Sequence, residues 1–155
     1  MTVNALHVVI PGIADVIMSS ASADIECAAA GPCAGDFITG GGWITGTPSG
    51  AKANFGVAGG IKQGSLWGHL TYMDHGNGMH VMATSVTAYA VDTSDSTCRD
   101  ISYAVTINGA LGTAKVIACD KGQSGHFDIL DITLSNGYQA GGTLGGGNIR
   151  LHLCK

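Results

Sequence analysis

The stretch CRDISYAVTINGALGTAKVIAC, residues 98–119, decides the fold of this chain. Asn108-Gly109 lies at its centre, and Asn-Gly is the strongest short hairpin signal because both central residues of a type I′ turn need a positive φ. With a two-residue turn, counting outward places Cys98 opposite Cys119. Directly opposed strand residues have Cβ atoms about 4.5–5.5 Å apart, near the reach of a disulfide. We therefore predict a hairpin stapled at its open end.

A second Asn-Gly pair, at residues 77–78, predicts another hairpin. The same count places His75 opposite His80 and Met73 opposite Met82. Residues two apart on a strand point the same way, so the four side chains share one face. Two imidazoles beside two thioethers suit copper, particularly Cu(I), and zinc is the other candidate metal. The alternatives are packed methionines with a solvated histidine pair, and a longer turn that breaks this register.

The composition favours strands and excludes one class of partner. Of 155 residues only 12% are charged, and 25 are glycine. Short apolar runs separated by Gly, Asn and Asp, with no helical pattern between them, predict an all-β antiparallel sandwich or jelly roll over residues 36–155. The net charge of −4 comes without a basic patch, which argues against nucleic-acid binding. Pro11-Gly12 interrupts the apolar N-terminal stretch, so we predict no transmembrane segment.

Residues 1–35 form a predicted extension with a strand at 6–10 and a linker or short helix within 14–30. The strand carries large aliphatic side chains at Leu6, Val8 and Ile10. A detached apolar strand can complete the sheet of a neighbouring molecule, which predicts a homo-oligomer or filament. The alternative is a strand that pairs within its own sheet. Residues 21–23 also resemble a signal-peptidase site, although no Lys or Arg precedes the apolar stretch.

The chain has five cysteines, without a CxxC pair or zinc-finger spacing. Cys27 and Cys33 flank a short loop that can close on itself, so we predict a second disulfide there, and Cys154 is left over. Disulfides indicate an extracellular or cell-surface protein. The alternative is a reduced cytosolic protein with buried thiols.

An acidic, glycine-containing loop begins at Asp120 and is followed by Asp128. Such a loop can bind Ca²⁺ through carboxylates and carbonyls, but the order of ligands is not that of an EF-hand. The alternative is a solvated turn. No Gly-x-Ser-x-Gly elbow occurs, and Glu26 is the only glutamate, so no catalytic residues are assigned.

Several motifs in a fixed order carry a resemblance to a known family. They are TGGGWI at 39–44, AKANFGV at 51–57, GHLTYMDH at 68–75, GMHV at 78–81, SVTAY at 85–89, LSNGY at 134–138 and GGGNIRLH at 145–152. Together they resemble the post-choice-of-anchor β domain of large secreted bacterial and archaeal proteins, over residues 36–152. The resemblance implies an extracellular β domain and no activity. The cysteines and the N-terminal segment are departures from it.

The sequence favours a non-catalytic extracellular structural or adhesive β module, a self-assembling surface or filament subunit that uses its N-terminal strand. Its partners would be further copies of itself, the extracellular matrix or a polysaccharide. The first alternative is a metal-dependent secreted enzyme or metal-binding protein centred on His75 and His80. The second is a carbohydrate-binding module that uses exposed aromatic rings. The rings available for it are Trp43, Trp67, Tyr72, Tyr89, Tyr103 and Tyr138.

Overall fold

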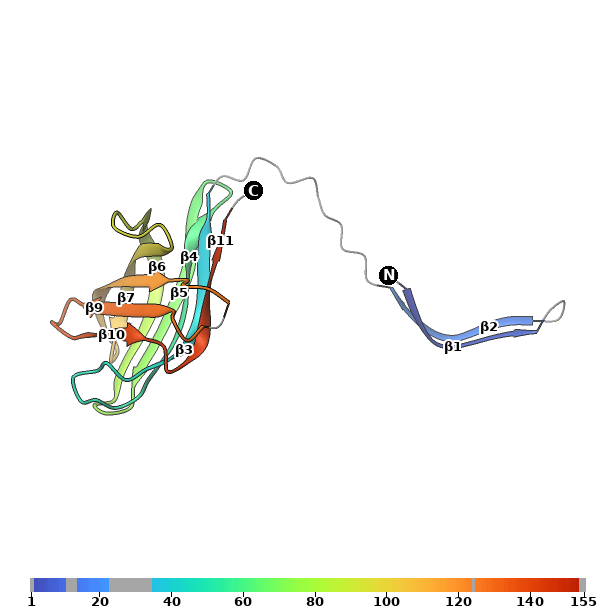
Figure 1. The fold of residues 1–155 in the computed structure, drawn as a ribbon, viewed down its shortest axis with the longest axis horizontal. Helices are drawn as coiled ribbons and strands as arrows, with labels where there is room; N and C mark the ends of the chain where they lie inside the picture. The colour runs from blue at the N-terminus through green and yellow to red at the C-terminus, as the bar shows by residue number, and fades with distance from the viewer. Residues whose placement is uncertain (1, 11–13, 23–34, 124, 154–155) are drawn as a thin grey trace. The chain divides into compact units, whose positions relative to one another are not determined.

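The computed structural model describes residues 2–10, 14–22, 35–123 and 125–153 (Figure 1). Over these residues it contains strands and no helix, and every strand pairing is antiparallel, so the predicted all-β class is confirmed. The chain divides into two compact units, Met1–Pro32 and Cys33–Lys155. No helix in the described part is long and apolar enough to cross a membrane.

The first unit contains a two-stranded sheet of β1 (Thr2–Ile10) and β2 (Ala14–Ser22), with Val8 opposite Val16. The expected strand at 6–10 is therefore present. The expected short helix is wrong for residues 14–22, and the rest of its range lies outside the described residues. Two apolar runs that flank a Pro-Gly signal are typical of a hairpin, and pairing satisfies the backbone groups of both.

The second unit is a nine-stranded sheet in which each strand from β3 to β10 pairs with the next along the chain, and β11 returns to pair with β3. Its strands are β3 (Phe37–Ile44), β4 (Ala53–Lys62), β5 (Ser65–Asp74), β6 (Met79–Val91), β7 (Cys98–Ile107), β8 (Ala110–Cys119), β9 (Ile129–Leu134), β10 (Gln139–Thr143) and β11 (Gly146–His152).

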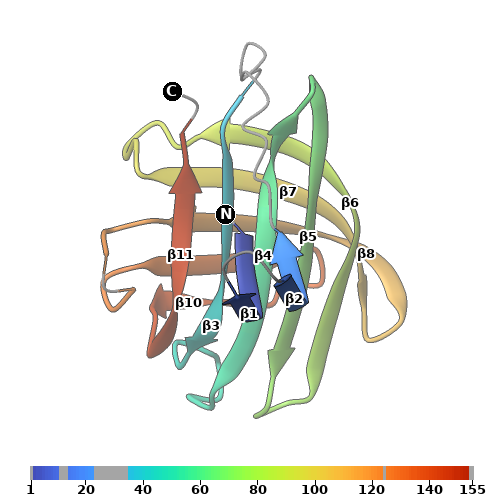
Figure 2. The same cartoon turned by 90° about the vertical axis from the view of Figure 1, so that its right-hand side faces the viewer.

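The sheet curls over on itself, so that β7, β9 and β10 cross behind β3, β4, β5 and β11 (Figure 2). The longest strand, β6, joins the two halves. Its ladder with β7 shifts register between Ala83 and Ser85 and again between Val86 and Ala88. Such bulges bend a strand and let it pass from one layer to the next, which gives the sandwich-like arrangement.

The core lies between the two layers. Alternate side chains at the start of β4 point inward, and Ala53, Phe55 and Val57 are all buried. The largest fully buried side chains are those of Tyr72, Tyr103, Ile38, Ile44, Leu70, Ile101, Leu130, Ile132 and Ile149. Burial of this apolar surface drives the collapse of the two layers onto each other.

The hairpin at 98–119 forms as predicted. Asn108 and Gly109 both have a positive φ, 48° and 86°, and Cys98 pairs with Cys119 both in the ladder and as a disulfide. The predicted pair of Cys27 and Cys33 lies outside the described residues, as does Cys154.

The hairpin between β5 and β6 has a different register from the predicted one. Met73 lies opposite His80 and Thr71 opposite Met82, so the pairing of His75 with His80 is wrong. Asp74 explains the difference. Its carboxylate accepts the N–H of Gly76 (2.8 Å), and its carbonyl accepts the N–H of Gly78 (2.9 Å), which widens the turn and leaves His75 inside it.

Candidate functional site

The acidic loop between β8 and β9 closes the free edge of β11. Asp128 is completely buried, and its Oδ2 accepts the N–H of Ile149 (2.7 Å) while its Oδ1 accepts the N–H of Lys121 (2.8 Å). Asp120 repeats the arrangement two residues further along β11, because its Oδ2 accepts the N–H of Leu151 (2.9 Å). We call Asp120 and Asp128 the β11 cap. It supplies the acceptors that a tenth strand would otherwise provide.

At the opposite edge of the sheet, the middle of β10 is bonded as well. The N–H of Gly141 donates to the carbonyl of Gly46 (2.8 Å), just beyond β3. The connection between β10 and β11 is also hydrogen-bonded, since the N–H of Gly145 donates to the carbonyl of Trp43 (2.9 Å). Unpaired strand edges invite association with other chains, so covering both edges protects this sheet against pairing with a further strand.

A second polar cluster lies in the core. The Tyr138 hydroxyl donates to Oδ2 of Asp74 (2.8 Å) and accepts a hydrogen bond from the Tyr72 hydroxyl (2.7 Å). Burial raises the pKa of Tyr138, and its hydrogen bonds to Tyr72 and Asp74 raise it further. Burial likewise raises the pKa of Tyr72. Both phenols therefore stay protonated, so that Tyr72 donates to Tyr138 and Tyr138 donates to the fully buried carboxyl group of Asp74.

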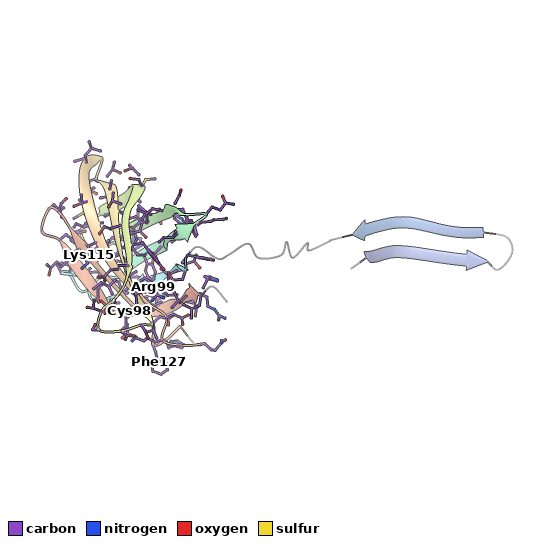
Figure 3. All side chains as sticks on the ribbon, turned by 90° about the horizontal axis from the view of Figure 1, so that it is seen from above. Cys98, Arg99, Lys115 and Phe127 are labelled. Atoms are coloured by element: carbon purple, nitrogen blue, oxygen red, sulfur yellow. A yellow bond between two sulfur atoms is a disulfide. The ribbon has the colours of Figure 1, made fainter. Side chains whose placement is uncertain are left out.

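The third cluster surrounds Arg99, which lies beside Cys98 at the start of β7 (Figure 3). Its guanidinium is buried, is paired with Asp36 and donates to the carbonyls of Ser96 (2.8 Å) and Cys98 (2.7 Å). Tyr89 donates to the second oxygen of Asp36 (2.7 Å). Burial alone would raise the pKa of Asp36, but the hydrogen bonds from Arg99 and Tyr89 and the charge of Arg99 outweigh it and hold this pKa below its usual value.

These three clusters account for the charged side chains that are buried among the described residues, namely Asp74, Arg99 and Asp128. Each accepts or donates hydrogen bonds that tie backbone or neighbouring side chains together. Buried polar groups with hydrogen-bond partners stabilise one arrangement of the core. None of them was predicted in this role, because their partners are distant in sequence.

The predicted metal residues are only partly brought together. Met73, His80 and Met82 share the outer face of β5 and β6, whereas His75 lies in the turn. In the described part of the chain, no group of three or more His, Cys, Asp or Glu side chains is placed to hold a metal ion. The predicted calcium ligands, Asp120 and Asp128, direct their oxygens at N–H groups instead.

The aromatic side chains divide between the core and the outer face. Tyr72, Tyr103 and Tyr138 are buried, so they are not available to a sugar. On the outer face, the Phe37 ring stacks on His152 with centroids 4.3 Å apart and meets Trp67 edge-on at 5.5 Å. Phe37 was missed as part of this group. The ladder brings it beside Trp67, because both lie opposite Gly60 and glycine leaves room between them.

Comparison with known proteins gives no relative: no family model, no curated protein and no solved structure matches the chain. The resemblance to the post-choice-of-anchor domain therefore stays a prediction from the motifs.

Proposed function

We propose that this chain is a non-catalytic extracellular structural module that assembles with further copies of itself through its N-terminal hairpin. The observation that carries the proposal is the closure of the nine-stranded sheet. Both of its edge strands are hydrogen-bonded to other parts of the domain, and its buried charged groups are engaged in hydrogen bonds that hold the fold together. A unit held together in this way suits a repeating building block.

Two further observations support an extracellular location. The disulfide between Cys98 and Cys119 is of the kind that persists in oxidising compartments. The ordered motifs over residues 36–152 resemble a domain of secreted proteins.

The hairpin of β1 and β2 supports the assembly step. An isolated two-stranded hairpin is marginally stable in water, so it gains from pairing with further strands. In the described residues no third strand pairs with it. Because the edges of β10 and β11 are covered, we infer that the partner is the hairpin of another copy rather than its nine-stranded sheet. Such contacts give a filament when the rotation between copies does not close.

The test compares the full chain with Val8→Pro, which removes a backbone donor in the middle of β1. Val8→Thr keeps a β-branched residue and is the matched control. We expect the full chain and Val8→Thr to form polymers in electron micrographs and by light scattering. Val8→Pro, and a chain lacking residues 1–22, are expected to stay monomeric with unchanged unfolding of the nine-stranded domain. A wild-type chain that stays monomeric at all concentrations, or a Val8→Pro chain that polymerises, contradicts the proposal.

The outer aromatic group favours a second function, binding of a matrix polysaccharide. Phe37 and Trp67 are half-buried on the outer face, on either side of Gly60, and aromatic rings of this kind can stack on sugars. Trp67→Ala is expected to abolish retention on an insoluble polysaccharide such as cellulose or chitin. Tyr103→Phe, a change in the core, serves as the control. Equal retention of Trp67→Ala and the wild type removes this function.

A further inference from the structure

Three soft-donor side chains lie together on the outer face of the β5–β6 hairpin. Met73 lies directly opposite His80, and Met82 is two residues beyond His80 on the same strand. We call these three side chains the soft-donor patch. Opposed residues have Cβ atoms about 4.5–5.5 Å apart and diagonal neighbours are about 7–8 Å apart, distances that long methionine side chains can span.

The two methionines do not fill the core. Met73 is 41% exposed and Met82 is 48% exposed, and His80 is exposed as well. By contrast, Met79 at the start of the same strand is packed against the core. Exposed methionines are unusual, since this residue type is most often buried. Packing therefore does not explain the position of Met73 and Met82.

A hollow of about 300 Å³ opens beside the patch, and Met73 and His80 form part of its wall. The rest of the wall is contributed by Asn54, Phe55, Gly56, Thr71 and Tyr72. The ladder neighbour of Met82 on β7, Thr106, is also uncharged. Among the described residues no lysine, arginine or carboxylate lines the hollow, so neither a repelling cation nor a hard oxygen anion competes with the thioether and imidazole donors.

We propose that Met73, Met82 and His80 bind a soft monovalent metal ion, Cu(I). Thioether ligands select Cu(I), whereas Ca²⁺ and Mg²⁺ prefer oxygen donors, and the patch offers two thioethers and one imidazole. His75 is not a ligand, because the register places it in the turn rather than beside His80. The site lies on the nine-stranded domain, so it is independent of assembly through the N-terminal hairpin.

The test uses Ag(I), a redox-inert ion with the same preference for sulfur, and Cu(I) held reduced by ascorbate. Any free thiol is alkylated first, because the chain has five cysteines. In the full-length protein, Ag(I) is expected to shift the NMR signals of the Met73 and Met82 methyl groups and of the His80 ring. The signals of Met79 and His75 are expected to stay in place.

Affinity for Cu(I) is then measured by competition with a chromogenic Cu(I) chelator. Met73→Leu, Met82→Leu and His80→Gln are each expected to weaken binding by about tenfold or more, equivalent to about 1.4 kcal/mol. Met79→Leu and His75→Gln are the matched controls and are expected to bind as the wild type does. Unfolding in urea shows that each variant is folded. The proposal fails if Ag(I) leaves the Met73 and Met82 signals unmoved, if the three variants bind normally, or if His75→Gln loses binding.

Discussion

Asp128→Ala removes the carboxylate that holds the middle of β11. In the folded protein its two oxygens accept the N–H groups of Ile149 and Lys121. Ile149 is completely buried, so its N–H finds no substitute, and losing a hydrogen bond to a charged group costs about 1.5–3 kcal/mol. Lys121 is half-buried, so water can partly replace the hydrogen bond that its N–H loses. This second loss costs about 0.5–1.5 kcal/mol. We expect the free energy of unfolding to fall by about 2–4.5 kcal/mol.

Two assays check this loss. Unfolding in urea gives its size, and amide hydrogen exchange gives its place, because the N–H of Ile149 should exchange much faster in Asp128→Ala. Asp120→Ala is the graded comparison. It frees the N–H of Leu151, which is half-buried, and should destabilise the protein by less than Asp128→Ala. The reasoning is refuted if Asp128→Ala unfolds within about 0.5 kcal/mol of the wild type, or if exchange at Ile149 does not change.

Three other predictions concern the stability of the nine-stranded domain. Replacing Cys98 and Cys119 by Ala opens a loop of 21 residues and should lower the free energy of unfolding by about 3 kcal/mol, measured in urea without reductant. Tyr138→Phe leaves a buried carboxylate short of a donor and should cost about 1–3 kcal/mol, against about 0.5–1.5 kcal/mol for Tyr72→Phe. Asp36→Asn should be less stable than the wild type. The difference in their free energies of unfolding should be largest at neutral pH and should shrink in acid.

The sign of the last effect follows from the pKa of Asp36, which folding holds below its usual value of 3.8. A depressed carboxyl pKa contributes stability that is fully present above the unfolded-state pKa and is lost as the pH falls through the folded-state pKa. Unfolding in urea at a series of pH values measures it, and a difference between wild type and Asp36→Asn that stays constant down to about pH 2 contradicts it. The tyrosine prediction is contradicted if both tyrosine variants lose the same free energy of unfolding. The disulfide prediction is contradicted if the Cys98 and Cys119 variant is as stable as the wild type.

The parts of the fold that local sequence determines were predictable. Asn108-Gly109 needs two positive φ values, and the hydrogen bonds between Asn108 and His80 leave its two-residue turn in place, so the predicted turn and the Cys98–Cys119 pair are confirmed. The same Asn-Gly rule predicted the wrong register for the turn after β5. There Asp74 is held in the core by Tyr138, and its carboxylate takes the N–H of Gly76. A tertiary contact 64 residues away thus sets a local register.

The candidate site was less predictable for the same reason. Asp128 was recognised as part of an acidic loop, but its acceptor role depends on Ile149, which lies 21 residues further along the chain. Arg99 and Asp36 are 63 residues apart, and nothing in the local pattern of either links them. The soft-donor patch was partly predicted, because Met73, His80 and Met82 follow from strand alternation, whereas excluding His75 needed the observed turn.

Sedimentation or light scattering of residues 35–155 tests the closure of the nine-stranded sheet most directly. This unit has its own core and disulfide and should fold without the hairpin. With β10 and β11 both covered, it should remain a monomer at every concentration at which the full chain polymerises. Concentration-dependent association of this unit by itself would mean that a strand edge is open, and it would contradict the closure of the sheet.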